Sequence, residues 1–437
     1  MPEKSQLEVA TQESKQEVGD KQPDIELRPQ EYFLDNGLKV LLVEDHKATI
    51  ATFQIWYKVG SINEMPGETG LSHMLEHMMF KGTKRYGSKV FSNLIQKNGG
   101  VDNAFTTKNY TMYYQTLKSD RLALSIELEA DRMENLLLNE EDFKSEKQVV
   151  MEERRLRTED NHQNLLFEEL TARAISTHPY RNPVIGWMDD ISSFTVDALQ
   201  QHYNNYYRPN NAVVIVTGDI NPHETLKLIR TYFGPIPSKP IKPVSMPIEP
   251  KQEGAKRVVI KKPAVQPYLL MAYHVPSIPN KDSYALDVLA SVLSSKSGRL
   301  YQELVKSHKV ALNAFVFYSG FYSDPYLMYF GGSAMGGKDT DAVEKGILEE
   351  IEKVKTTPPA EREIQKAKNQ IEASFIMGQD SIYFQGELLG MYDMLGNWRL
   401  KDRYLEEIRN VTVEDVKRVA ATYLTEQNRT TGILIPE

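Results

Sequence analysis

The distribution of apolar residues divides the chain into strands and helices. Strands are expected where β-branched, aromatic and other apolar residues alternate or run continuously, at 33–45, 48–61, 101–118 and 211–220. Helices are expected where apolar residues recur every three or four positions, at 70–80, 90–100 and 120–174. Turn signals at Asn36-Gly37 and near Lys108-Asn109 predict that two of the strand segments, 33–45 and 101–118, are β-hairpins.

A proline-rich stretch separates these elements from a second, similar set. Residues 235–253 contain six prolines, which predict a semi-rigid linker. The order of elements then repeats, with a strand, a helix, a hairpin and a helix expected at 267–276, 283–295, 312–333 and 360–377. Both hairpins carry the triplet Asn-Ala-Phe near their start, at 103–105 and 313–315.

We therefore expect an α+β protein with two similar tandem domains, each a mainly antiparallel sheet covered by helices. The expected division has four parts: a disordered polar leader at 1–26, a first domain at 27–234, the linker at 235–253 and a second domain at 254–437.

The helix expected at 70–80 has two different faces. Its apolar residues form one core-facing stripe, which consists of Leu71, Met74, Leu75, Met78 and Met79. His73, Glu76 and His77 cluster on the opposite side of the helix. The predicted helix thus packs against a core with one face and presents two imidazoles, one turn apart, with the other.

Two histidines at positions i and i+4 can bind one metal ion. The chain contains no Cys, so Zn²⁺ with His and carboxylate ligands is the natural guest. Glu76 is placed to hydrogen-bond a water in the open position of a catalytic zinc site. It would act as general base while the zinc lowers the pKa of that water. The alternative is a solvated helix face with incidental histidines, against which the clean separation of the two faces argues.

A third ligand is expected from the charged segment 142–160. Glu146 and Glu153 are seven residues apart and share a helical face, whereas Glu152 points elsewhere. Val149 and Val150 between them indicate that this side is partly buried, and buried acids require a cation. For any single glutamate, a merely solvated helix is the alternative.

Composition narrows the function classes. The 52 basic and 60 acidic residues give a net charge of -8, which argues against a nucleic-acid-binding surface. The sequence has no apolar run of the ~18 residues that a transmembrane helix needs. Residues 1–26 lack the apolar region of a signal peptide. The expected compartment is therefore the cytoplasm as the sequence is written, or the periplasm if a signal peptide has been removed.

The H-x-x-E-H motif at 73–77, with the E-x6-E spacing that follows at 146–153, resembles the pitrilysin-type (inverzincin) zinc metallopeptidases. The resemblance covers the chain from about Glu31 and extends to GLSHMLEHMMFKGT, GGVDNAFTTKNYTMYY, HPYRNPVIG, YYRPNNAVVIVTGD and SGRLYQEL. The chain is similar to the zinc-bearing subunit of the small bacterial heterodimeric members and of the mitochondrial processing peptidase.

This resemblance implies a role for each candidate residue: zinc ligands at His73, His77 and Glu153, a catalytic base at Glu76 and an outer supporting acid at Glu146. It also implies that the strand carrying Asn103, Ala104 and Phe105 pairs with an extended peptide substrate. The implied architecture is half of a clam-shell chamber, and the implied activity is that of a zinc metalloendopeptidase.

One departure from the family pattern bears on activity. Active members carry an Arg and a Tyr, seven residues apart, in a second-half motif that resembles E-L-R-x-x-x-G-L-A-Y. The aligned stretch here is ELVKSHKVAL, with Val305 and Leu312 at those positions. Because neither side chain donates a hydrogen bond, we expect a heterodimer with a homologous zinc-free subunit that supplies the pair. A homodimer and a non-catalytic structural or peptide-binding subunit are the alternatives.

Overall fold

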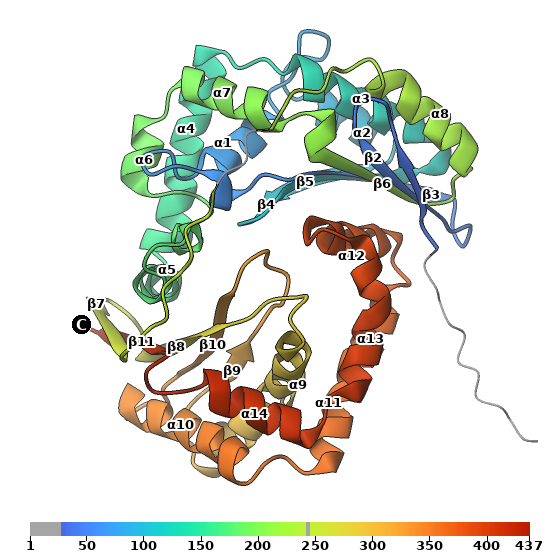
Figure 1. Cartoon of the computed structure of the whole chain (residues 1–437). Coiled ribbons are helices and arrows are strands. Elements are labelled where there is room, and N and C mark those ends of the chain that lie inside the picture. Colours follow the sequence, from blue (N-terminus) through green and yellow to red (C-terminus); the bar gives the residue numbers. More distant parts are fainter. Residues whose placement is uncertain (1–27, 242–244) are drawn as a thin grey trace, which may run out of the picture.

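Two mixed β-sheets form the framework of the computed structural model, which describes residues 28–241 and 245–437 (Figure 1). The first sheet has six strands in the order β1-β2-β6-β3-β5-β4, and the second has five in the order β7-β11-β8-β10-β9. The leader expected at 1–26 lies outside the described residues. No helix in the described ranges is long and apolar enough to cross a membrane.

The five strands of the second sheet follow the topology of β2 to β6 in the first, and β1 has no counterpart. The first comprises β1 (Gln30–Phe33), β2 (Lys39–Glu44), β3 (Ile50–Tyr57), β4 (Val101–Thr106), β5 (Thr111–Lys118) and β6 (Ala212–Gly218). The second comprises β7 (Lys256–Lys262), β8 (Tyr268–Val275), β9 (Phe315–Phe317), β10 (Tyr326–Ser333) and β11 (Arg429–Pro436). In each sheet a single parallel pair, β2 with β6 or β7 with β11, adjoins strands that pair antiparallel. The expected α+β class with two similar halves is confirmed.

Helices surround both sheets. Those before the linker are α1 (Leu71–Met78), α2 (Val90–Lys97), α3 (Leu122–Asn135), α4 (Glu140–Arg154), α5 (His162–Ala174), α6 (Met188–Ser193), α7 (Val196–Tyr206) and α8 (Pro222–Phe233). Those after it are α9 (Asp282–Ser294), α10 (Thr340–Thr356), α11 (Glu361–Gly378), α12 (Ile382–Met394), α13 (Lys401–Asn410) and α14 (Val413–Tyr423). Shorter turns are 3-10 helices at 61–63, 119–121, 179–181, 209–211 and 398–400, and π-helical segments η3 (Arg155–Glu159) and η6 (Tyr301–Ser307).

The segment expected to be helical from 120 to 174 contains two new helix N-termini, those of α4 and α5. The side chain of Asn139 accepts a hydrogen bond from the backbone N–H of Asp142 and caps α4. The side chain of Asn161 caps α5 in the same way, by accepting from the N–H of Asn164. The π-helical segment η3 extends α4 to Glu159, and Asp160 and Asn161 separate it from the start of α5.

The expected domain boundary at 235–253 remains a proposal, but the linker itself is not a loose spacer. Its described residues run between α8 and β7. The carboxylate of Glu249 accepts hydrogen bonds from the backbone N–H groups of Ser176, Thr177 and His178. This part of the linker is therefore fixed against the first half.

Each sheet is covered on one face by helices from its own half and on the other face by a helix from the opposite half. α12 packs on β3 and β6 of the first sheet, and α5 packs on β7, β8 and β11 of the second sheet (Figure 1). In this second contact Leu166, Leu170 and Ala174 of α5 join a buried cluster with Leu270 and Leu434. The two halves therefore exchange a helix.

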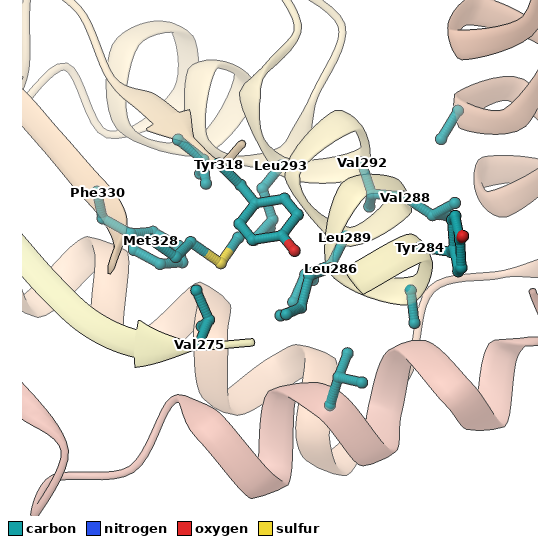
Figure 2. Close-up of a cluster of buried hydrophobic side chains, with 14 of the residues drawn as sticks. Val275, Tyr284, Leu286, Val288, Leu289, Val292, Leu293, Tyr318, Met328 and Phe330 are labelled. Atoms are coloured by element: carbon teal, nitrogen blue, oxygen red, sulfur yellow. The ribbon is translucent and has the colours of Figure 1, made fainter. Parts of the chain in front are cut away.

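The other face of the second sheet carries the larger core. Figure 2 shows Leu286, Leu289 and Leu293 of α9 packed toward Met328 and Phe330 of β10. All five side chains are fully buried. Both faces of β10 are thus enclosed, which explains why its sequence is an almost continuous apolar run rather than an alternating one.

Two glycines set the distance between α12 and the first sheet. A Cβ atom at Gly390 would overlap the indole ring of Trp56, and one at Gly386 would lie 2.8 Å from the side-chain amide of Gln54. Polar contacts accompany this close packing, because Gln54 Nε2 donates to the carbonyl of Tyr383 at 2.9 Å. The helix therefore lies closer to β3 than it could if residues 386 and 390 carried side chains.

We predict that Gly390→Ala destabilises the protein. Alanine normally stabilises a helix interior by about 1 kcal/mol relative to glycine, but the overlap with Trp56 should reverse the sign and cost about 1–3 kcal/mol. Urea unfolding measures the difference. Gly336→Ala is the control, because a Cβ there meets nothing within 4 Å and the residue lacks a positive φ. A Gly390→Ala variant as stable as the control would show that α12 can move away from the sheet at no cost.

Candidate active site

The start of α1 is fixed by backbone contacts. Glu64 is buried, and its carboxylate accepts hydrogen bonds from the N–H groups of Gly70 and Ser72, both at 2.7 Å. Gly70 has a φ of +99°, and a Cβ atom there would overlap the carbonyl of Ile185. The helix thus begins where glycine alone allows the loop at 185–186 to approach.

The faces of α1 lie as its periodicity predicts. The apolar stripe is buried, with Met74, Leu75 and Met78 at 0% exposure. His73 and His77 extend from the other side toward α4. The helix is therefore held rigidly by its apolar face while its polar face lines a cleft.

His73, His77 and Glu153 come together between α1 and α4. Their candidate ligand atoms all lie within 4.8 Å of one another. Glu153 Oε2 is 3.3 Å from Nε2 of His77, and its Oε1 is 3.9 Å from Nε2 of His73. Two imidazole nitrogens and a carboxylate oxygen that converge in this way match the donor set of a catalytic zinc site. Among the described residues this is the only group of at least three such side chains.

Glu146 lies one layer outside this group. Its Oε1 is 2.9 Å from Nδ1 of His77, and its other oxygen pairs with Lys81. A hydrogen bond at Nδ1 fixes the orientation of the His77 ring and leaves Nε2 to face Glu153. His73 has no such support, because its buried Nδ1 has no hydrogen-bond partner among the described residues.

The two imidazoles differ in electrostatics. Burial, and then the neighbouring His77, lower the pKa of His73 to about 4, so this ring is neutral as ligation requires. Burial also acts to lower the pKa of His77, but the carboxylates of Glu146 and Glu153 outweigh it and raise the pKa to about 9. A metal ion at Nε2 of His77 therefore has to displace a proton.

Glu76 stands apart from this ligand group. Its Oε2 accepts a hydrogen bond of 2.5 Å from Oγ1 of Thr106, at the end of β4. Burial raises the pKa of its carboxyl above the ordinary value, against the opposing effect of Thr106. A carboxylate of raised pKa that faces the same cleft without joining the ligands is suited to accept and release a proton.

The cleft has a volume of about 660 Å³ and is open to solvent. Asn103, Ala104 and Phe105 line it together with His73, Glu76 and His77. β4 is the edge strand of the first sheet and pairs only with β5 among the described strands. The backbone groups on its other side are therefore those to which an extended peptide would add.

Other residues singled out in the sequence lie away from the cleft. Glu152 is exposed and pairs with Arg155 at 3.0 Å. Val150 is fully buried, but Val149 is 48% exposed, so the expectation that both valines face a buried side is wrong for Val149. Val305 is partly buried against the larger core, and Leu312 is 44% exposed. Neither residue lines the cleft.

Sequence reasoning missed three basic residues around the site. Lys81 pairs with Glu146, and Arg157 donates to Glu153 Oε1 at 2.6 Å. Arg157 lies four residues after Glu153, a spacing that signals contact along a helix, whereas the partner of Lys81 is distant in the sequence. Lys108 is half-buried, and its Nζ donates to the carbonyls of Tyr180 and Asn182, both at 2.8 Å. Nothing in its local sequence distinguishes it from a solvated turn lysine.

We predict that Glu146→Gln weakens zinc binding by about 10- to 100-fold, because the variant loses the charged hydrogen bond that orients His77. Competition with a chromophoric chelator measures the affinity. Glu152→Gln is a matched control on the same helix, and its affinity should stay that of the wild type. Equal zinc affinities for the two variants would exclude a supporting role for Glu146.

Both halves of the chain match peptidase family models. Residues 39–187 match the model described as Insulinase (Peptidase family M16), and residues 193–371 match the one described as Peptidase M16 inactive domain. The zinc protease PqqE of Helicobacter pylori is 33% identical over 408 residues, which are 92% of each chain. The zinc protease YmxG of Bacillus subtilis is 26% identical over 397 residues, 90% of this chain and 95% of that one.

Solved structures agree with these matches. The crystal structure of a protease from Helicobacter pylori superposes with a TM-score of 0.90 at 32% identity, covering 94% of this chain and all of that one. The periplasmic protease PqqL from Escherichia coli shares the fold, with a TM-score of 0.77 at 17% identity. The alignment covers 94% of this chain but only 48% of PqqL.

Proposed function

The chain belongs to the M16 family of peptidases, and we propose that it is the zinc-bearing subunit of a metalloendopeptidase. Its two relatives described above are named zinc proteases. The observation that carries this proposal is the convergence of His73, His77 and Glu153 beside a glutamate, Glu76, that is not one of them. A purely structural metal site would have no use for such a base.

Zinc held by His73, His77 and Glu153 would supply Lewis acidity toward a peptide carbonyl and lower the pKa of water. The protein's own contribution is proton transfer and positioning. Glu76 takes a proton from the attacking water and returns it to the leaving amine nitrogen. Thr106 holds the Glu76 carboxylate at 2.5 Å, and thus ties the base to the strand along which the substrate lies.

The free edge of β4 positions the substrate. An extended peptide paired with the backbone at Asn103, Ala104 and Phe105 would lie near Glu76, because Thr106 of the same strand hydrogen-bonds to that carboxylate. Backbone pairing accepts most side chains, so this edge selects for extended conformation rather than for sequence.

A partner subunit is the second element of the proposal. The second half offers Val305 and Leu312 where a hydrogen-bonding Arg and Tyr are expected, and its family match is to an inactive domain. This chain also aligns with about half of the PqqL chain, which is consistent with a chamber built from two such units. The proposed partner is a homologous, zinc-free subunit that carries the Arg/Tyr pair.

We predict that Glu76→Gln binds zinc like the wild type and has no detectable peptidase activity, because it removes the base but no ligand. His77→Ala should lose both zinc and activity. Zinc content by elemental analysis and hydrolysis of a quenched fluorescent peptide give the two readouts. Turnover by Glu76→Gln would contradict the assigned role.

We further predict that hydrolysis requires the partner. The zinc-loaded chain is assayed alone and with the homologous subunit that co-purifies from the native host. Activity that appears only in the mixture supports the split site. A chain that is equally active alone would show that other residues stabilise the developing negative charge, and inactivity in both states would favour the non-catalytic alternative.

A further inference from the structure

Two arginines line the active-site cleft with guanidinium donors that no described acid fully occupies. Arg181 is exposed on the 3-10 turn that follows His178 and lines the cleft. Among the described residues no side chain bonds to or pairs with its guanidinium group; only its backbone N–H donates, to the carbonyl of His178. The chain has a net charge of -8, so a cation without an acidic partner in the cleft runs against the overall charge of the protein.

Arg157 is the second cation. Its Nη1 bonds to Glu153, but 74% of the side chain is exposed, so its remaining N–H donors face the cleft and solvent. In the proposed function Glu153 is a zinc ligand. Its charge is then shared with the metal, and the guanidinium of Arg157 is less fully neutralised.

The remaining charges in the cleft are already engaged. Glu168 is buried and accepts two hydrogen bonds from Arg154, at 2.7 and 3.0 Å. The ammonium group of Lys108 donates hydrogen bonds to two backbone carbonyls. Glu76 and Glu153 belong to the proposed machinery. The charge left over for a substrate to meet is therefore positive, at Arg181 and Arg157.

From this charge distribution we infer that the cleft selects peptides that carry a carboxylate close to the scissile bond, with Arg181 as the principal specificity residue and Arg157 as the second. The inference rests on the proposed function and names the substrate class of that site. Guanidinium groups bind carboxylates through paired, charge-assisted hydrogen bonds. The carboxylate has two possible sources, an acidic side chain or the C-terminus of the peptide.

Binding tests the inference independently of catalysis. The full-length Glu76→Gln variant, loaded with zinc, is titrated with fluorescein-labelled Ala/Ser/Val peptides. In one series Glu is scanned through the peptide and each member is compared with its Gln counterpart. In a second series a free C-terminal acid is compared with the C-terminal amide. We expect one series to show about tenfold tighter binding of the carboxylate, and that series identifies its source.

Arg181→Gln should reduce this preference to less than about twofold, since it removes the charge but not the cleft. Arg173→Gln is the matched control, because Arg173 is also exposed but does not line the cleft. Arg157→Gln should weaken the preference partly, relative to Arg155→Gln, with zinc content checked in both. Circular dichroism verifies folding.

Equal affinities within every carboxylate and amide pair, or an unchanged preference in Arg181→Gln, overturn the inference. Separate hydrolysis assays decide the proposed function. A chain that binds carboxylates preferentially but never cleaves a peptide would retain this specificity and lose the assigned activity. A chain that cleaves both members of every carboxylate and amide pair equally would retain the activity and lose this specificity.

Discussion

A sheet with two apolar faces must be covered twice, and in this chain each sheet has one of its two faces covered by a helix from the opposite half. Helices of the first half pack on one face of the first sheet, whereas α5 packs on the second sheet. The second half returns α12 to the first sheet. This reciprocal burial makes the two halves one structural unit.

The exchange also supports the chemistry. α4 carries Glu153 and is extended by η3, which carries Arg157. Two residues later begins α5, whose apolar side lies on the second sheet. The buried pair of Arg154 and Glu168 joins the two helices, and Thr171 of α5 hydrogen-bonds to the hydroxyl of Tyr329 in β10 at 2.9 Å. One ligand is thus anchored from the far half of the molecule, while His73 and His77 are anchored from the near half.

The parts of this arrangement that sequence reasoning predicted are those written in local spacing. The two faces of α1, the hairpins around Asn36-Gly37 and Lys108, and the repeated order of elements all follow from periodicity and turn residues. The family motifs predicted that Glu153 joins the two histidines as a ligand. Local spacing cannot reveal contacts between distant segments, so the exchange of α5 and α12 was not anticipated. Sequence reasoning missed the positive cleft because only the fold brings Arg181 and Arg157 to the lining of one cleft.

The exchanged helices have a consequence for biosynthesis. When the first half leaves the ribosome, the face of its sheet that carries Trp56 has no cover until α12, more than 160 residues beyond β6, has been synthesised. Neither half can complete its core before α12 and β11 have been synthesised. Folding therefore requires closure of long loops late in translation, and the exposed apolar face of the nascent first half is a target for chaperones during that interval.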